Sequence, residues 1–287
     1  MPDWEDYTAD LEPDAHTVVG ALRLLRDLHS PQLDNARDVL VWLPPSYHDT
    51  DRRYPVLYMH DGQNLFDAGT SFAGEWEVDE TLTRLADEGI EAIVVGLANT
   101  EQRRSEYQPP GNKRSWLGPA QGDAYLDFVV NTVKPMVDAD FRTLPDRAHT
   151  AMAGSSMGGL ISLYALYRHP ELFSMIGAFS PALWFTSASM AELIRKAGHI
   201  PARIYLDVGT AEGGVAQHLP EDERPREVVA SQRYVESVVQ VRNALLNAGY
   251  IEGESLVYVE AEDAGHNEPA WAARLPDALR FLLGPVV

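Results

Sequence analysis

The sequence predicts an α/β fold with a mainly parallel central sheet, an antiparallel edge at its N-terminal side, and helices on both faces. Seven short runs rich in β-branched and aromatic residues recur along the 287-residue chain, and helical patterns lie between several of them. Such alternation is typical of βαβ units. The fully apolar character of residues 92–97 and 175–179 indicates central strands that are buried on both sides.

The N-terminal part of the chain predicts the antiparallel edge. Residues 16–43 contain two or three strand patterns with no helix between them. Pro44 and Pro45 then end this edge, because proline cannot donate a hydrogen bond to a strand ladder. We expect residues 1–15 to form an N-terminal extension and the chain, residues 1–287, to fold as a single domain.

The rest of the chain predicts the parallel part of the sheet. Strands are expected at 39–43, 55–60, 92–97, 149–154, 175–180, 203–209 and 255–260. Helices are expected at 74–89, 123–141, 157–170 and 231–249. Residues 99–122 and 210–230 follow neither pattern and are long for connections in a compact domain. Loops of this length on an α/β scaffold often build the functional site.

Charge and composition exclude several classes of function. The chain has 43 acidic and 23 basic residues, a formal net charge of −20, which would repel nucleic acids and anionic lipid surfaces. It has no cysteine, so a thiolate nucleophile and thiolate metal sites are absent. The acidic start lacks the features of a signal peptide, and no apolar run is long enough to cross a bilayer. We expect a soluble, cytoplasmic protein; its oligomeric state is not indicated.

The segment from Gly154 to Gly158 fits the nucleophile pattern G-x-S-x-G with Ser156 at its centre. An apolar strand pattern runs into the motif and a helical pattern follows it, as a strand–turn–helix elbow requires. The serine then lies at a helix N-terminus, where negative charge is stabilised. Ser155 does not fit the spacing. The competing interpretation is a glycine-rich turn with incidental serines.

A serine nucleophile needs a histidine base, and in this architecture the base follows the serine in the chain. His266 is the best candidate because it lies in the loop after the last predicted strand, and His218 is the second. His169 ends the helix after the elbow, where a histidine usually serves the helix dipole. His199 precedes a strand and is expected to be exposed.

The acid of the triad should follow the penultimate strand. Glu212 lies three residues after Gly209 and is preferred. Asp207 lies inside the strand, where a buried carboxylate is more plausibly structural. Asp263 is a further alternative because it is close to His266 in the chain.

Two backbone N–H groups are the candidates for an oxyanion hole. Met157 directly follows the nucleophile, and Gln63 lies in the glycine turn Asp61-Gly62-Gln63-Asn64 after the strand at 55–60. The alternative is that this turn is only an Asx-type turn.

These segments resemble the "Putative esterase" family of α/β hydrolases, which includes esterase D, feruloyl and acetylxylan esterase domains, enterochelin-type esterases and mycolyltransferases. The resemblance covers residues 16–283. It is carried by DVLVWLPPSYHDTDRRYPVLYMHDGQNLFD at 38–67, GEWEVDE at 74–80, AGSSMGGLISLYALYRHPELF at 153–173, AFSPALWF at 178–185, DVGTAEG at 207–213 and AGHNEPAW at 264–271. It implies an α/β-hydrolase fold, a triad of Ser156, Glu212 and His266, and oxyanion donors at Gln63 and Met157.

The resemblance also suggests substrate-binding residues. Trp76 and Trp184 are expected to line the pocket, with burial in the core as the alternative for either. Asn64 and Arg104 are further candidates for substrate binding. Arg103 and Tyr107 are candidates to contact an anionic or aromatic acyl group, although each alone is more simply an exposed surface residue. Arg103, Arg104 and Lys113 together could form a basic pocket in an acidic protein.

The resulting hypothesis is a serine carboxylic ester hydrolase that forms an acyl-enzyme with a small-molecule or carbohydrate-linked ester. No cofactor or metal is expected, because the sequence contains neither HExxH nor a comparable metal-ligand spacing. The alternatives are an acyltransferase with the same triad and a non-catalytic ligand-binding protein on a hydrolase scaffold.

Overall fold

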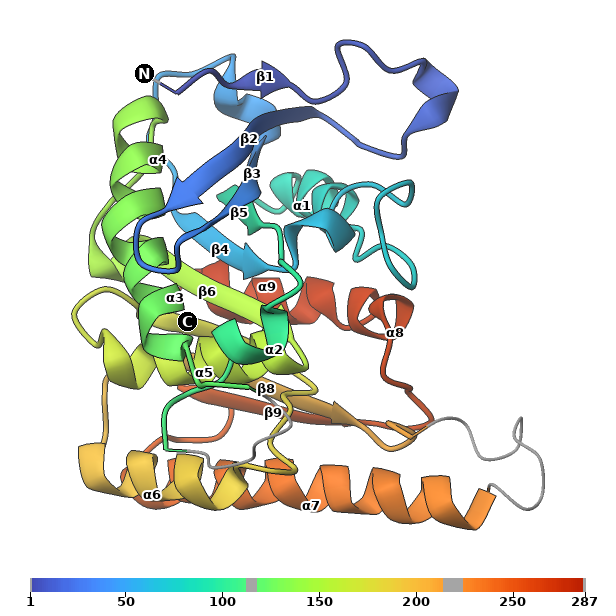
Figure 1. Cartoon of the computed structure of the whole chain (residues 1–287), viewed down its shortest axis with the longest axis vertical. Helices are drawn as coiled ribbons and strands as arrows, with labels where there is room; N and C mark the ends of the chain where they lie inside the picture. The colour runs from blue at the N-terminus through green and yellow to red at the C-terminus, as the bar shows by residue number, and fades with distance from the viewer. Residues whose placement is uncertain (1, 112–117, 214–223, 286–287) are drawn as a thin grey trace.

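A computed structural model describes residues 2–111, 118–213 and 224–285, which form one nine-stranded sheet between two layers of helices (Figure 1). The strand order is β1-β2-β3-β5-β4-β6-β7-β8-β9. The strands are β1 (Glu5–Asp6), β2 (Ala21–Ser30), β3 (Asn35–Leu43), β4 (Val56–His60), β5 (Ile93–Leu97), β6 (Thr150–Ser155), β7 (Met175–Phe179), β8 (Arg203–Gly209) and β9 (Leu256–Ala261).

The sheet has the predicted mixture of directions. Strands β1, β2, β3 and β5 pair antiparallel, and β5, β4, β6, β7, β8 and β9 pair parallel. Strand β3 ends at Leu43, directly before Pro44, as the missing proline N–H predicts. The carboxyl ends of the parallel strands therefore meet at one edge of the sheet, where open α/β folds place their sites.

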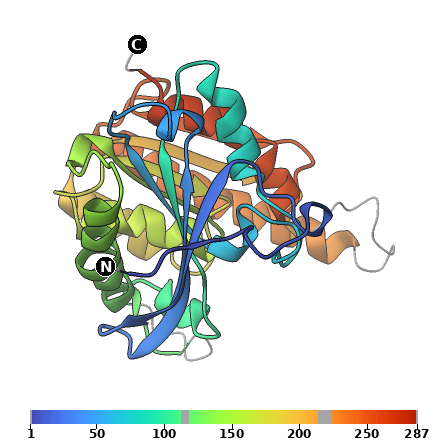
Figure 2. The same cartoon turned by 90° about the horizontal axis from the view of Figure 1, so that it is seen from above.

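Helices cover both faces of this sheet (Figure 2). One face packs against helices α3 (Gly122–Phe128), α4 (Lys134–Asp140), α5 (Met157–Arg168), α6 (Ser187–Ala197) and α7 (Arg224–Ala248). The other face packs against helices α1 (Val78–Ala86), α8 (Glu268–Ala272) and α9 (Leu275–Leu283). Within β4, Val56 and Tyr58 face the first layer, while Leu57 and Met59 face the second. The predicted fold class is confirmed.

Several elements differ from the sequence prediction. Helices α6 and α9 were not expected, and α7 begins at Arg224, so the predicted irregular segment 210–230 is partly helical. Segment 99–122 contains the short helix α2 (Arg103–Glu106). The helix expected at 123–141 is interrupted by a π-helical turn at Val129–Val133.

The N-terminal residues are attached to the sheet. Strand β1 pairs with β2, and the Trp4 ring packs against Phe141 with centroids 5.0 Å apart. The indole N–H of Trp4 also donates to Asp140 at 2.9 Å. No helix within the described ranges combines the length and the apolar character that crossing a bilayer would need.

Candidate active site

Ser156 lies in a sharp turn between strand β6 and helix α5. Its backbone has φ 55° and ψ −120°, a conformation that few non-glycine residues adopt. The N–H of Ser156 donates to the carbonyl of Phe179 at the end of β7, with N and O 2.9 Å apart. Ser156 lines a cleft of about 600 Å³, which it shares with His266. The turn thus presents the serine at the edge of the sheet.

Glycine is required on both sides of this turn. A Cβ at Gly154 would lie 2.9 Å from the carbonyl carbon of Gly158 and 2.9 Å from the ring of His60. A Cβ at Gly158 would lie 3.1 Å from Cβ of His60. His60 itself is fully enclosed and shares a hydrogen bond of 2.7 Å with the hydroxyl of Tyr125. Burial lowers the pKa of His60 to about 3. The imidazole that packs against the two glycines of the turn is therefore neutral.

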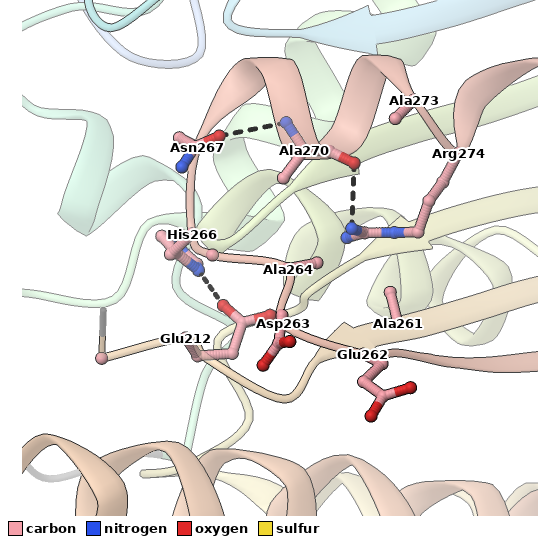
Figure 3. A pocket seen from close by; sticks show the side chains of 12 residues that line it. Glu212, Ala261, Glu262, Asp263, Ala264, His266, Asn267, Ala270, Ala273 and Arg274 are labelled. Atoms are coloured by element: carbon pink, nitrogen blue, oxygen red, sulfur yellow. Dashed lines mark hydrogen bonds and ion pairs between the residues drawn. The ribbon is translucent and has the colours of Figure 1, made fainter. Parts of the chain in front are cut away.

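Glu212 and His266 meet across two adjacent loops (Figure 3). Glu212 follows β8 and His266 follows β9, and Oε2 of Glu212 lies 2.5 Å from Nδ1 of His266. The second oxygen, Oε1, accepts the N–H of Gly209 at 2.6 Å. No side-chain surface of Glu212 is exposed, whereas 28% of the His266 side chain is. The carboxylate thus fixes the imidazole by Nδ1 and leaves Nε2 available to a reactant.

The loops that carry these two residues are packed backbone to backbone. A Cβ at Gly209 would lie only 2.1 Å from the carbonyl oxygen of Ala264. The N–H of Ala211 donates to the same carbonyl at 3.1 Å. Glycine at 209 is therefore needed to bring the Glu212 loop against the His266 loop.

The alternative acids have other partners. Both carboxylate oxygens of Asp207 bind the Arg274 guanidinium, at 2.7 and 3.2 Å, and Asp207 also accepts the N–H of Ser180 at 2.8 Å. Asp263 lies in the His266 loop, but the dashed line from His266 in Figure 3 ends on Glu212. The geometry favours Glu212 as the partner of the base.

The other downstream histidines lie elsewhere. His169 ends helix α5, where Nε2 is 3.6 Å from the Asp127 carboxylate. The ring of His199 packs against Tyr250, with centroids 4.7 Å apart. His218 lies outside the described residues.

The turn after β4 brings Gln63 to the same cleft as Ser156. Asp61 begins the turn with φ 59°, and Gln63 lies within the short 3-10 helix η3 (Gly62–Asn64). The Asp61 carboxylate binds Arg103 rather than the backbone of its own turn, so the Asx-turn alternative does not apply. Met157 is the first residue of α5, and its N–H therefore has no acceptor inside the helix.

Asn64 and Arg104 both line the cleft. The Asn64 amide is already bound: Nδ2 donates to Glu268 at 2.9 Å, and Oδ1 accepts the N–H of Phe72 at 3.1 Å. Arg104 is exposed and makes no ion pair with the residues that the structure describes. Lys113, the third member of the expected basic pocket, lies outside the described residues.

The two tryptophans have different environments. Trp76 is 3% exposed and belongs to the core, where its ring packs against Phe179 and Trp271 with centroids 5.0 and 5.8 Å apart. Trp271 lines the cleft, whereas Trp76 does not, so the expectation that Trp76 lines the pocket is not met. Trp184 is 44% exposed and lines a neighbouring recess together with Tyr234 and Glu212.

Two residues of the first long loop, Arg103 and Tyr107, are less exposed than the sequence predicted. Tyr107 is completely buried, and its ring packs against Tyr125 with centroids 4.8 Å apart. The Arg103 guanidinium forms an ion pair with the buried carboxylate of Asp61 at 2.6 Å. Buried aromatic and paired charged side chains in a segment without strand or helix pattern cannot be distinguished from exposed ones by sequence alone.

The sequence did not point to Tyr234 or Glu268. The hydroxyl of Tyr234, on α7, donates to the carbonyl of Ser180 at 2.7 Å. Its ring lies 5.5 Å from that of His266. Glu268 begins α8 in the cleft wall, and burial raises its pKa. Only the position of Glu268, two residues after His266, was a local signal.

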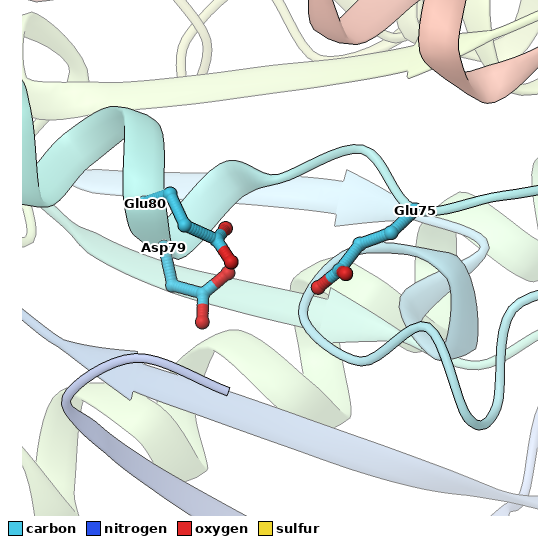
Figure 4. A group of neighbouring side chains, drawn as sticks. All are labelled: Glu75, Asp79 and Glu80. Atoms are coloured by element: carbon cyan, nitrogen blue, oxygen red, sulfur yellow. The ribbon is translucent and has the colours of Figure 1, made fainter. Parts of the chain in front are cut away.

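Three carboxylates, those of Glu75, Asp79 and Glu80, form a second group of polar side chains (Figure 4). Oxygens of these three residues lie within 4.8 Å of one another. Carboxylate oxygens are ligands that Mg²⁺ and Ca²⁺ prefer. Asp79 is buried, and its Oδ2 accepts the N–H of Val19 at 2.7 Å. None of the three lines the cleft that holds Ser156.

Comparison with known proteins identifies the family. The family described as "Putative esterase" matches residues 30–282, most of the chain. The chain belongs to this esterase family. YbbA of Bacillus subtilis is 26% identical over 259 residues, which cover 86% of this chain and 93% of YbbA. The siderophore triacetylfusarinine C esterase of Aspergillus fumigatus is 33% identical over 137 residues, 46% of each protein.

A solved structure shows the same fold. The siderophore hydrolase EstB from Aspergillus nidulans superposes with a TM-score of 0.74 at 19% identity, covering 93% of this esterase and 96% of EstB. The esterase has the α/β-hydrolase fold, and the predicted family, fold and enzyme class are confirmed.

Proposed function

We propose that this esterase is a serine carboxylic ester hydrolase that works through an acyl-enzyme. The observation that supports this most directly is the Glu212–His266 pair, because His266 lines the same cleft as Ser156, a serine held in a strained strand–turn–helix elbow. The three residues follow three different strands, β6, β8 and β9, whose carboxyl ends meet at one edge of the sheet.

The proposed reaction uses the two ring nitrogens of His266 for different tasks. Oγ of Ser156 attacks the ester carbonyl while Nε2 of His266 takes the hydroxyl proton. The Glu212 carboxylate stabilises the resulting imidazolium through Nδ1. The N–H groups of Gln63 and Met157 stabilise the tetrahedral oxyanion. The oxyanion collapses, the alcohol leaves with the proton from His266, and the acyl group remains on Ser156.

Hydrolysis repeats these steps with water. His266 takes a proton from the water that attacks the acyl carbonyl, and it returns that proton to Oγ of Ser156 as the carboxylic acid departs. The substrate is a small-molecule or carbohydrate-linked ester. The cleft of about 600 Å³ has the size of a small-molecule site. Relatives named as siderophore esterase and siderophore hydrolase support a small-molecule substrate.

Covalent labelling tests this proposal. A fluorophosphonate probe should label the wild-type protein and Ser155→Ala, but not Ser156→Ala, and peptide mapping should place the label on Ser156. The wild type should hydrolyse at least one ester from a panel of acetyl, butyryl, octanoyl and feruloyl esters. On that ester, kcat of Ser156→Ala should be lower by about 10³-fold or more.

Product analysis then separates hydrolysis from acyl transfer. Free acid should exceed transfer product when an alcohol acceptor is added at modest concentration. A folded wild-type protein with neither labelling nor turnover would favour a ligand-binding protein, and label on Ser155 would overturn the assignment of the nucleophile.

A further inference from the structure

Three polar side chains hold the turn that carries Gln63. Asp61 accepts two hydrogen bonds from the Arg103 guanidinium, from Nε to Oδ1 at 2.6 Å and from Nη2 to Oδ2 at 2.7 Å. Asn99 adds a third bond from Nδ2 to Oδ1 at 2.6 Å. Asp61 follows β4, whereas Asn99 and Arg103 follow the adjacent strand β5. The cluster of Asp61, Asn99 and Arg103 therefore ties the ends of two neighbouring strands together.

The same segment also contacts Gln63 directly. The backbone N–H of Asn99 donates to Oε1 of Gln63 at 3.2 Å. On the preceding residue, a Cβ at Gly62 would lie 2.7 Å from the carbonyl carbon of Gly96 and 2.8 Å from the nitrogen of Leu97. Asn99 thus fixes the side chain of Gln63, and the backbone of β5 packs closely against the preceding residue, Gly62.

The turn needs such support because of the conformation of its first residue. Asp61 has φ 59°, in the left-handed region that non-glycine residues rarely occupy. Such a conformation persists where the surroundings determine it, and two bonds from a guanidinium plus one from an amide fix the Asp61 side chain. Without these bonds, the turn could relax and the direction of the Gln63 N–H would change.

The charge of Asp61 is maintained in the fold. Asp61 is 7% exposed, and burial alone would raise its pKa, but Arg103 and Asn99 hold the pKa below its usual value. Arg103 also lies over the ring of the buried Tyr107, with its guanidinium carbon 5.2 Å from the centroid. Both carboxylate oxygens of Asp61 are thus committed to the cluster, and Arg103 is committed to Asp61 although it lines the cleft.

We propose that Asp61, Asn99 and Arg103 are positioning residues that aim the N–H of Gln63 at the oxyanion. This proposal rests on the proposed function, because it assumes that Gln63 donates to a tetrahedral intermediate on Ser156. The three residues act through Gln63 and do not need to touch the substrate. Their effect belongs to the transition state, where the negative charge on oxygen develops.

Kinetics of Asn99→Ala, Arg103→Lys and Asp61→Asn test the proposal. Each variant should lose about 10- to 100-fold in kcat with less than about threefold change in KM, since a misplaced donor weakens the transition state selectively. The affinity for a trifluoromethyl ketone, which adds to Ser156 and forms an oxyanion, should fall by the same factor as kcat/KM. Inhibition by the product carboxylate should not change.

Arg168→Gln is the matched control, because it removes an exposed guanidinium that binds Asp123 at 3.1 Å outside the cleft. It should retain wild-type kcat and KM. In Asn99→Ala, Asp61 and Arg103 still form their ion pair, so this variant should fold. It therefore tests the positioning role even if Asp61→Asn is poorly folded. Melting temperatures establish that the compared variants are folded.

Two results would overturn the proposal. In one, folded Asn99→Ala and Arg103→Lys keep kcat within about twofold of the wild type. In the other, they raise KM without lowering kcat or the affinity for the ketone, which would make the cluster a substrate-binding site. A wild-type enzyme that neither turns over esters nor reacts with the fluorophosphonate would instead contradict the proposed function itself.

Discussion

At the scale of single residues, both oxygens of Glu212 are used to orient one ring. Oε1 accepts the N–H of Gly209 while Oε2 faces Nδ1 of His266, and the carboxylate is shielded from solvent. In such a setting the negative charge stabilises the imidazolium that forms when Ser156 loses its proton. The charge of Glu212, beyond its shape, should therefore determine the rate.

Replacement of Glu212 by glutamine tests this. Glu212→Gln keeps the size of the side chain but removes the charge, so we expect kcat to fall on the order of 10³- to 10⁴-fold with little change in melting temperature. Asp263→Asn is the matched control, since Asp263 lies in the same loop as His266 without binding its ring, and it should keep full activity. A loss below tenfold for Glu212→Gln would show that another acid supports His266.

The sequence could predict residues that belong to a local pattern. Ser156 is marked by flanking glycines, and Glu212 and His266 each follow a recognisable strand. Tyr234 lies on a long helix and meets the ring of His266 only through the tertiary fold, so no local pattern marks it. The burial of Trp76 was missed for the same reason, because the aromatic residues that pack against it come from β7 and α8.

At the scale of elements, the junction of β6 and α5 depends on close packing between backbone atoms. Helix α5 can start directly after Ser156 only because Gly154 and Gly158 lack side chains. His60 fills the space on the other side and is itself enclosed. Neither side of the turn has free volume to accept a methyl group.

Gly154→Ala should therefore affect both stability and catalysis. A Cβ at this position meets backbone and a buried ring at 2.9 Å, so we expect a loss of about 1–3 kcal/mol in the free energy of unfolding. The displaced turn should also lower kcat about 10-fold or more. Urea unfolding and ester turnover measure the two effects, and wild-type values for both would contradict the packing described for the elbow.

The helices that the sequence did not predict have identifiable reasons. Helix α6 turns Met190, Leu193 and Ile194 toward the core, an i, i+3, i+4 pattern that is present in the sequence but short. Helix α9 has apolar residues at Leu275, Leu279 and Leu282 and a proline in its first turn, a signal that could have predicted it. Strands were easier to predict because those in the sheet centre are fully buried and almost entirely apolar.

At the scale of the whole molecule, the net charge of −20 makes buried carboxylates costly. Burial and the neighbouring Glu80 raise the pKa of Asp79 to about 9, and burial and nearby carboxylates raise that of Glu75 to about 7. The folded protein thus binds protons that the unfolded chain releases near pH 4. Stability contributed by these groups is present below about pH 4 and is lost as the pH rises to about 9.

Asp79→Asn should consequently stabilise the protein at pH 8. Asparagine can still accept the N–H of Val19 but carries no charge, so we expect a gain of about 1–3 kcal/mol at pH 8 and little change at pH 4. Urea unfolding in EDTA at both pH values measures this. Asp87→Asn, on the exposed end of α1, should have little effect at either pH. A less stable Asp79→Asn at pH 8 would show that the charge is favourable in the fold.

The strands β6, β7, β8 and β9 lie side by side in the order in which the ribosome makes them. Ser156 therefore emerges early, whereas its proposed base His266 emerges only after three further strands, β7, β8 and β9, and helices α5, α6 and α7 have been synthesised. A nascent chain that has completed its elbow still has no group to activate the hydroxyl. Molecules interrupted before β9 lack the proposed base and should therefore be inert toward esters.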